Sequence, residues 1–276
     1  MSPTVNDVDA FWQSNPLWSG ESAFEPGSKE FFEEHRQVVR REGFAGKFDQ
    51  RCLPLVGNRD VVLDLGCGIG FWTVELGLIG CQHIVAADLT QRALDLTRIR
   101  CNQYGVIAET VKQNAEAMSF PDATFGHVNC QGVIHHTPDT EGCIREIARV
   151  LRPNGTASIS VYYRNVLLSL WPWISWIGRS IARLGGKLRG RGREEIFLLS
   201  DVDELVRTFD GKHNPIGKCY SRRQFLEMLQ PYFHVKELFL HFFPARALPF
   251  PLPRLLHSRL DGRLGFLIYA NVMKLG

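Results

Sequence analysis

Between residues 60 and 162 of this chain, short apolar runs alternate with longer amphipathic segments. Strands that alternate with helices of about ten to fifteen residues form a parallel sheet with helices on both faces, because right-handed crossovers leave no other compact arrangement. The sequence therefore predicts an α/β fold, doubly wound around a mostly parallel sheet. The expected strands are residues 61–65, 84–88, 107–111, 125–130 and 156–162.

Polar residues mark the starts of the helices in this unit. Thr90 can cap the helix after the second strand, and Asp139 or Thr140 can cap one that runs to Leu151. The Pro-Asn-Gly sequence at 153–155 is expected to end that helix before the next strand begins.

The alternation stops after residue 163 and resumes at Ser221, which can cap a further helix. Strand patterns follow at residues 234–243 and 264–272. The Pro-rich segment 244–253 between them is too short for a crossover with a full helix, so the two strands are expected to be antiparallel neighbours. They bring the predicted sheet to seven strands, with an antiparallel last strand.

These patterns divide the chain into four expected segments. The first is a helical lead-in at residues 1–57, and the second is an α/β core at 58–163. A helical cap insertion follows at 164–220, and the last segment, 221–276, holds a C-terminal helix and two strands.

Composition excludes several classes of protein. Hydrophobic residues make up 45% of the 276 residues and charged residues 22%, which is ordinary for a globular protein. The formal net charge of +3 is far below the basic surplus of a protein that neutralises many phosphates, so no nucleic-acid partner is expected. The seven cysteines form no C-x-x-C pair, which argues against a zinc site or a disulfide framework and fits a reducing cytoplasm.

No targeting signal is expected from the N-terminus or from the apolar stretches. The acidic N-terminus lacks the apolar region of a secretory signal. The longest apolar stretch, residues 166–178, is interrupted by Pro172 and is shorter than the roughly 20 residues that span a bilayer. A cytoplasmic protein without a transmembrane helix is therefore expected.

A glycine-rich turn joins the first predicted strand to its helix. Residues 63–70 read LDLGCGIG, and glycines let the backbone approach a ligand at the N-terminus of the following helix. Asp88 ends the second strand, where a carboxylate can accept hydrogen bonds from both hydroxyls of a ribose. Glycines also serve ordinary tight turns, but together these features indicate a nucleoside-containing cofactor.

Two details favour an amino-acid nucleoside over a dinucleotide. The G-x-G-x-x-G fingerprint would place its third glycine at position 71, which is Phe71. Asp64, two residues before the first glycine, suits a nearby ammonium group better than a pyrophosphate.

On these residues the chain resembles the class I S-adenosylmethionine-dependent methyltransferases, in particular the small-molecule branch similar to ubiquinone and menaquinone biosynthesis enzymes. The resemblance covers about residues 60–162. Besides LDLGCGIG, its motifs are ADLT at 87–90, QNAEAMSFPD at 113–122, GVIHHTPD at 132–139 and RVLRPNGT at 149–156. It implies a Rossmann-like methyltransferase fold, S-adenosyl-L-methionine as cofactor and S-adenosyl-L-homocysteine as product.

The resemblance also assigns roles to individual positions. The glycines would cradle the methionine part of the cofactor with Asp64 near its amino group, Asp88 would bind the ribose, and Gln131 would face the sulfonium and substrate. Asn114 stands where the family usually has Asp in the adenine loop, so charge assistance is lost there. The implied cofactor residues are Asp64, Gly66, Cys67, Gly68, Gly70, Asp88, Leu89, Asn114, Ala115, Glu116 and Gln131.

His135 and His136 follow the fourth strand, at the sheet edge where ligands of such folds bind. One of them, His136 in particular, is a candidate to assist deprotonation of an acceptor or to orient it. The alternative is that both only support the loop structurally. No metal ligands are expected.

Three other groups are candidates for the acceptor side. The lead-in aromatics Phe11, Trp12 and Trp18 either form part of a lid or pack in the core. Residues 162–164 follow the fifth strand and could line the acceptor pocket. The third group consists of Lys218, Tyr220, Arg222 and Arg223. These polar side chains either bind a carboxylate or phosphate of the acceptor or are solvated at the start of a helix.

The insertion carries an apolar helical face. Residues 147–193 contain nine Lys or Arg and no acidic residue. This segment is either a cap for an apolar or lipid-linked acceptor, with peripheral membrane contact through residues 166–193, or an apolar face buried on the domain beside a solvated basic loop. The face consists of Trp173, Ile174, Ile177, Ile181 and Leu184.

The sequence thus predicts an S-adenosylmethionine-dependent methyltransferase that acts on a small molecule, at a hydroxyl or carboxylate oxygen. N- or C-methylation is the alternative within the same class. Outside that class, a non-catalytic module of methyltransferase descent and an NAD(P)-dependent oxidoreductase remain open.

Overall fold

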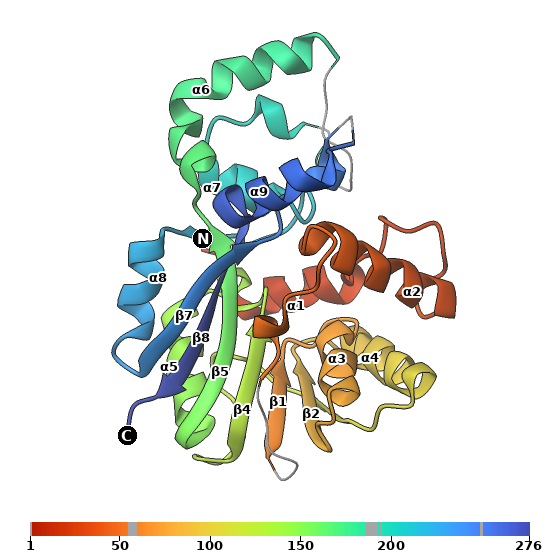
Figure 1. Cartoon of the computed structure of the whole chain (residues 1–276), viewed down its shortest axis with the longest axis vertical. Helices are drawn as coiled ribbons and strands as arrows, with labels where there is room; N and C mark the ends of the chain where they lie inside the picture. Colours follow the sequence, from red (N-terminus) through yellow and green to blue (C-terminus); the bar gives the residue numbers. More distant parts are fainter. Residues whose placement is uncertain (1, 55–59, 186–192, 194, 249–250) are drawn as a thin grey trace.

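A computed structural model describes residues 2–54, 60–185, 193, 195–248 and 251–276. Its centre is an open eight-stranded sheet in the order β3-β2-β1-β4-β5-β8-β7, with β6 paired to β5 off this path (Figure 1). Only β8 runs antiparallel to its neighbours, β5 and β7. The strands are β1 Val61–Leu65, β2 His83–Asp88, β3 Glu109–Lys112, β4 Phe125–Gln131, β5 Leu151–Tyr163, β6 Cys219–Tyr220, β7 Phe233–His241 and β8 Leu267–Lys274.

The predicted caps begin their helices. Thr90 Oγ1 accepts a hydrogen bond from Ala93 N, and Asp139 Oδ1 accepts one from Gly142 N at 2.8 Å. Ser221 forms a capping box with Gln224. The helices are α1 Val5–Ser14, α2 Lys29–Val38, α3 Phe71–Leu78, α4 Gln91–Tyr104, α5 Thr140–Val150, α6 Val166–Arg183, α7 Val202–Thr208, α8 Arg222–Leu229 and α9 Arg254–Leu264.

The mostly parallel α/β fold with an antiparallel last strand is confirmed, but the sheet has one strand more than predicted. The additional strand, β6, has only two residues, and so short a segment gives no apolar pattern. The connection between β7 and β8 contains a helix, α9, that was not predicted. Only the Pro-rich segment 244–253 was considered for this connection, and α9 begins just after it.

The turn at residues 153–155 differs from its expected role. Helix α5 already ends at Val150, and β5 begins at Leu151. Asn154 adopts a positive φ of 60°, and the pairing of β4 with β5 shifts register between Phe125 and His127. The Pro-Asn-Gly sequence therefore makes an irregularity inside a strand instead of ending a helix.

Apolar side chains cover both faces of the sheet. On one face, α5 and α8 pack Ile147 and Phe225, both fully buried, against the strands. On the other face, α3 packs Leu76 against β1 and β2, while Phe44 and Trp72 lie with aromatic residues of β7 and β8. The doubly wound core thereby fixes the carboxyl ends of β1, β2 and β4 at one edge.

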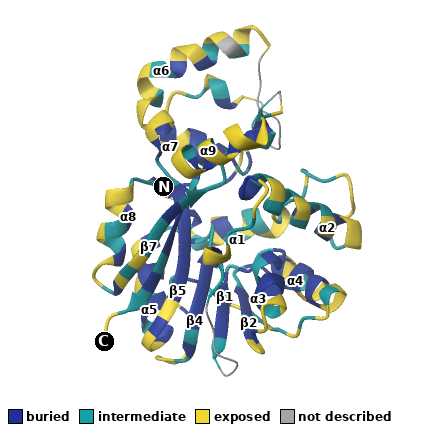
Figure 2. Ribbon diagram, in the orientation of Figure 1, coloured by how far each residue is buried: buried dark blue, intermediate teal, exposed yellow. Residues whose placement is uncertain are grey.

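Helix α6 stands beyond one end of the sheet and packs through one side only (Figure 1). Leu168 and Trp171 on that side join a cluster with Val206 of α7. Three residues of the predicted apolar face are exposed: Trp173 (79%), Ile177 (42%) and, just after the helix, Leu184 (89%), whereas Ile174 is half-buried. Figure 2 shows the exposed side of α6. The interpretation of this face as buried on the domain is therefore wrong for Trp173, Ile177 and Leu184, because Leu168 and Trp171 make the internal contacts instead.

Two points concern the rest of the insertion. The side chain of Ile181 and the basic residues Lys187, Arg189 and Arg191 lie outside the described residues. Among the residues that the structure describes, no helix is long and apolar enough to cross a membrane.

Candidate active site

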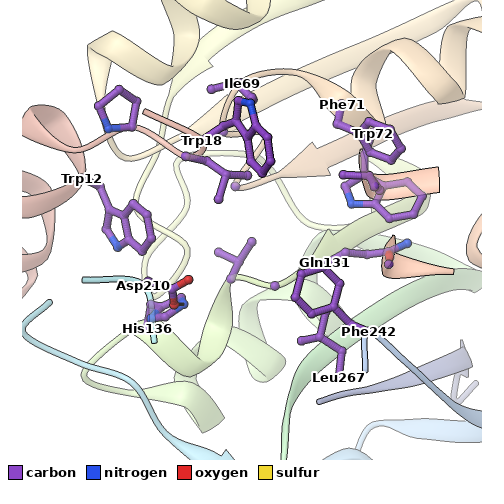
Figure 3. A pocket seen from close by; sticks show the side chains of 18 of the residues that line it. Trp12, Trp18, Ile69, Phe71, Trp72, Gln131, His136, Asp210, Phe242 and Leu267 are labelled. Carbon is purple, nitrogen blue, oxygen red and sulfur yellow. Dashed lines mark ion pairs between the residues drawn. The ribbon is translucent and has the colours of Figure 1, made fainter. Parts of the chain in front are cut away.

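A cavity of about 360 Å³ opens at the carboxyl ends of the parallel strands (Figure 3). Leu65 at the end of β1, Asp88 at the end of β2 and Gln131 at the end of β4 all line it. Ligands of doubly wound sheets bind at this edge. Of the predicted cofactor residues, those in the cavity wall are Gly66, Cys67, Gly68, Asp88, Leu89, Asn114, Ala115 and Gln131.

The glycine-rich turn is fixed by backbone geometry. Gly66 N and Cys67 N both donate to Ala87 O, at 2.7 and 3.0 Å, which ties the turn to the end of β2. Gly66 has a φ of 72°, and a Cβ there would lie 2.3 Å from a methyl carbon of Val133. Gly70, with a φ of 76°, is the N-cap of α3 and lies outside the cavity wall. The turn therefore requires glycine and leaves open space beside Gly68.

Asp88 is held by the turn that it faces. Gly68 N donates to Oδ2 at 3.0 Å, and Thr90 N donates to Oδ1 at 2.9 Å. Burial raises the pKa of Asp88, while the backbone hydrogen bonds from Thr90 and Gly68 oppose that shift. A carboxylate fixed in this way at the cavity wall could accept hydrogen bonds from a ribose.

Asp64 lies behind the cavity wall and does not line it. It is 1% exposed, and its carboxylate accepts hydrogen bonds from Thr73 Oγ1 at 2.5 Å and Asn129 Nδ2 at 2.7 Å. Burial raises its pKa to about 6. The structure thus ties Asp64 to α3 and β4, and its predicted place beside a bound ammonium group does not match these contacts.

Gln131 presents an unpaired acceptor at the cavity. Its amide Nε2 donates to Asn129 Oδ1 at 2.7 Å and to Cys52 O at 2.9 Å, which fixes the orientation of the carboxamide. Its Oε1 is buried and has no hydrogen-bond partner among the described residues. Because buried polar atoms are normally paired, this oxygen fits a ligand that carries a donor.

Only part of the predicted adenine loop lines the cavity. Asn114 and Ala115 line the cavity. Glu116 points elsewhere, because its Oε1 accepts a hydrogen bond from Asp139 N at 2.6 Å at the start of α5. Asn114 Oδ1 accepts from Glu116 N at 3.0 Å, so this amide shapes the loop.

The two adjacent histidines have different environments. His136 ends the short helix Ile134–His136 and lines the cavity, where the ring of Trp12 lies 5.2 Å from its own. His135 is fully buried behind the wall, and both its ring nitrogens lack hydrogen-bond partners among the described residues. Burial lowers the pKa of His135 well below its usual value, so that ring is neutral. Only His136 can reach a ligand.

The structure sorts the other candidates for the acceptor side. Trp12, Trp18 and Tyr162 line the cavity, whereas Phe11 and Tyr163 do not. The expected anion-binding cluster does not form there. Lys218 Nζ donates to Pro138 O at 2.7 Å, Tyr220 donates to Thr140, Arg223 pairs with Glu227, and Arg164 and Arg222 also lie outside the wall.

Several cavity residues were missed because they come from distant segments. Glu21 before α2 pairs with Arg193 at 3.4 Å and with Arg246 at 3.3 Å. Asp210 follows α7 and meets His136, with 3.4 Å between Oδ2 and Nε2. No local motif marks these residues, since only the folded chain brings the lead-in, the insertion and the C-terminal part to one cavity.

The cavity lies at the carboxyl edge of a doubly wound sheet, where ligands of such folds bind. A methyltransferase-domain family model matches residues 63–159. The chain is 30% identical over 179 residues to a ubiquinone biosynthesis O-methyltransferase of Aromatoleum aromaticum, covering 60% of this chain and 73% of that protein. It therefore belongs to the class I S-adenosylmethionine-dependent methyltransferases, in the branch similar to ubiquinone biosynthesis enzymes.

Other relatives match over shorter lengths or in fold alone. A ubiquinone/menaquinone biosynthesis C-methyltransferase of Vibrio parahaemolyticus is 30% identical over 110 residues, 38% of this chain and 42% of that protein. The chain spans about half the length of further O-methyltransferase relatives. The solved structure of a SAM-dependent methyltransferase from Methanosarcina mazei has a TM-score of 0.53 at 19% identity and covers 80% of this chain and 94% of its own.

Proposed function

We propose that this chain transfers a methyl group from S-adenosyl-L-methionine to a small-molecule acceptor, at a hydroxyl or carboxylate oxygen. One observation carries the proposal: the glycine turn with Asp88 and the ring of His136 line the same cavity. S-adenosyl-L-methionine supplies the methyl group on a sulfonium, a leaving group that is already activated. The protein then mainly has to align the acceptor.

The residues present fit such a cofactor. The positive φ of Gly66 and the open space at Gly68 make a cradle free of side chains, and Asp88 offers a fixed carboxylate for two hydroxyls. Gln131 Oε1 is a buried acceptor without a hydrogen-bond partner among the described residues, and a donor group of the cofactor could bind there. The rings of Trp12 and Phe242 give the cavity apolar wall for an acceptor, and the imidazole of His136 lies in the same wall.

We propose oxygen as the methylated atom because a hydroxyl loses its proton on methylation, and the imidazole of His136 lines the cavity where it could accept that proton. Carbon and nitrogen acceptors lose a proton as well, so they are the alternative within the same class. The relatives include both O- and C-methyltransferases. The proposal therefore rests on His136 and not on the names of the relatives.

The test is calorimetric titration of S-adenosyl-L-homocysteine into the wild-type protein and Asp88→Ala, with NAD as a control ligand. We expect binding to the wild type and loss of at least about tenfold in affinity in the variant, equal to about 1.4 kcal/mol. Asp95→Ala, on the exposed side of α4, removes the same charge outside the cavity and should bind like the wild type. Binding of NAD instead would favour an oxidoreductase, and binding that is equal in all three proteins would overturn the assignment of Asp88.

We also propose that α6 touches the surface of an anionic membrane, as suits an apolar acceptor. One stripe of the helix is apolar and exposed, and Arg183 is exposed near its end. Apolar and aromatic residues on one face with basic residues beside them are typical of interfacial helices. The stripe consists of Val166, Leu170, Trp173, Ile177 and, just after the helix, Leu184.

Liposome sedimentation tests this contact. Vesicles with phosphatidylserine should retain the protein, neutral vesicles should retain less, and Trp173→Gln should weaken retention. Leu255→Gln is the matched control, because Leu255 is 80% exposed but lies on α9. Equal retention of both variants would discard α6 as the contact. The absence of retention, together with a dimer in solution, would assign the stripe to a second copy.

We also propose a cytoplasmic location for this protein, because its seven cysteines are all free and buried.

A further inference from the structure

Three side chains from separate segments meet at the acceptor side of the cavity. His136 Nε2 lies 3.4 Å from Asp210 Oδ2. Tyr162, near the end of β5, donates its hydroxyl to the same carboxylate oxygen. All three line the cavity, and His136 and Asp210 lie side by side in Figure 3.

A backbone carbonyl fixes which nitrogen of His136 carries hydrogen. Nδ1 lies 2.7 Å from Ile216 O. A carbonyl oxygen can only accept, so Nδ1 is the donor, and in the neutral ring Nε2 carries a lone pair. That lone pair faces a carboxylate oxygen, which is also an acceptor. The two atoms form a hydrogen bond only when a proton is added to Nε2.

Tyr162 cannot supply that proton. Its hydroxyl is already the donor to Asp210. Burial and the nearby charge of Asp210 raise the pKa of Tyr162 well above its usual value, so the phenol keeps its hydrogen. Among the residues that the structure describes, none donates a hydrogen bond to Nε2 of His136. The proton that completes the pair has to come from a molecule in the cavity or from solvent.

We propose that Asp210 is a positioning residue that makes His136 the proton acceptor of this site. The inference rests on the proposed methyl transfer. The acceptor's O–H bond breaks as an N–H bond forms at Nε2, and the oxygen's electron pair forms the bond to the transferred methyl carbon. The electron pair of the carbon–sulfur bond stays on sulfur. The carboxylate of Asp210 pairs with the imidazolium, which releases its proton to solvent after turnover.

The position of Asp210 in the fold has a second consequence. The residue belongs to the segment between α7 and β6, whereas His136 belongs to the core after β4. The proton acceptor is therefore complete only when the insertion is docked on the core.

Nitrogen-15 NMR of histidine-labelled protein tests the proposal without an acceptor, because imidazole shifts distinguish a lone pair from a protonated nitrogen. The His136 signal is identified by its loss in His136→Gln. At one neutral pH, with S-adenosyl-L-homocysteine added, we expect the fraction of His136 protonated at Nε2 to fall several-fold in Asp210→Asn. In Tyr162→Phe this fraction should rise, because the carboxylate loses a competing donor. Asp203→Asn, an exposed change of the same kind on α7, should leave it unchanged.

Opposite shifts in the two cavity variants would not follow from a merely structural role. An unchanged spectrum in both variants would overturn the proposal, as would a lone pair on Nδ1 in the wild type. If Asp210→Asn does not fold, Tyr162→Phe and Asp210→Glu provide the test, with Asp210→Glu expected to retain the protonated fraction. Failure of the wild type to bind S-adenosyl-L-homocysteine by calorimetry would instead refute the proposed function, while spectra of the ligand-free protein would still decide the role of Asp210.

Discussion

Gly66→Ala isolates the geometry that the cofactor turn needs. An alanine there would be held at a φ of 72°, in the left-handed region, which costs about 1–2 kcal/mol. Its Cβ would also lie 2.3 Å from a methyl carbon of Val133, and overpacking of this kind costs about 1–3 kcal/mol more. We therefore expect the variant to lose about 2–5 kcal/mol of unfolding free energy, unless the turn moves and gives up its hydrogen bonds to Ala87.

The two contributions can be separated by matched variants. Gly105 has a similar φ of 66° with nothing within 4 Å, and it lies outside the cavity, so Gly105→Ala should lose only the backbone part. Val133→Ala removes the colliding methyl groups, so the double variant with Gly66→Ala should regain about 1–3 kcal/mol relative to the sum of the single changes. Urea denaturation measures these free energies.

Calorimetry with S-adenosyl-L-homocysteine measures the second effect of the same change. Gly66→Ala should weaken binding, and Gly105→Ala should not, because only the first alters the turn in the cavity wall. The reasoning would be refuted if Gly66→Ala were no less stable than Gly105→Ala, or if Val133→Ala gave no rescue in the double variant.

Two further predictions concern stability. Ile147 of α5 is fully buried against the sheet. Ile147→Ala should therefore lower the unfolding free energy by about 2–5 kcal/mol and Ile147→Val by about 0.5–1.5 kcal/mol in urea denaturation. A smaller loss in Ile147→Ala than in Ile147→Val would contradict this packing. His241 lies between Asp49 at 2.8 Å and Asp261 at 2.6 Å. Burial lowers its pKa, but these partners outweigh burial and raise it overall. The ion pairs should therefore add unfolding free energy that is fully present below about pH 6.5 and is lost as the pH rises through the raised pKa of His241. His241→Gln should flatten this dependence of the unfolding free energy on pH. An unchanged slope in the variant would count against the pairing.

The periodic elements were predictable because their signals are local. Residues 61–65 were expected as a strand, and β1 has the same bounds. A helix was expected after the glycine turn, and α3 begins there at Phe71. The caps at Thr90 and Ser221 were expected for the same reason, since a cap involves residues within one helical turn. The prediction that residues 153–155 end a helix was wrong, because a turn sequence can occur at an irregularity in a strand as well as at a helix end. The pairing of β5 with β4 decides between the two.

The site was only half predictable. The alternating pattern and the glycine turn placed Gly66, Asp88 and Gln131 at one sheet edge, because parallel strands share the edge at which they end. Burial separated Asp64 and His135 from that edge, although their neighbours in sequence line the cavity.

The sequence by itself determined the α/β class and the sheet edge at which the glycine turn lies, since both follow from patterns within a few residues. The tertiary structure alone decided that Asp210 meets His136, that Glu21 joins two arginines, and that the apolar stripe of α6 faces outward. These depend on the packing of segments far apart in the chain, and side-chain periodicity does not say against which neighbour a helix will bury its face.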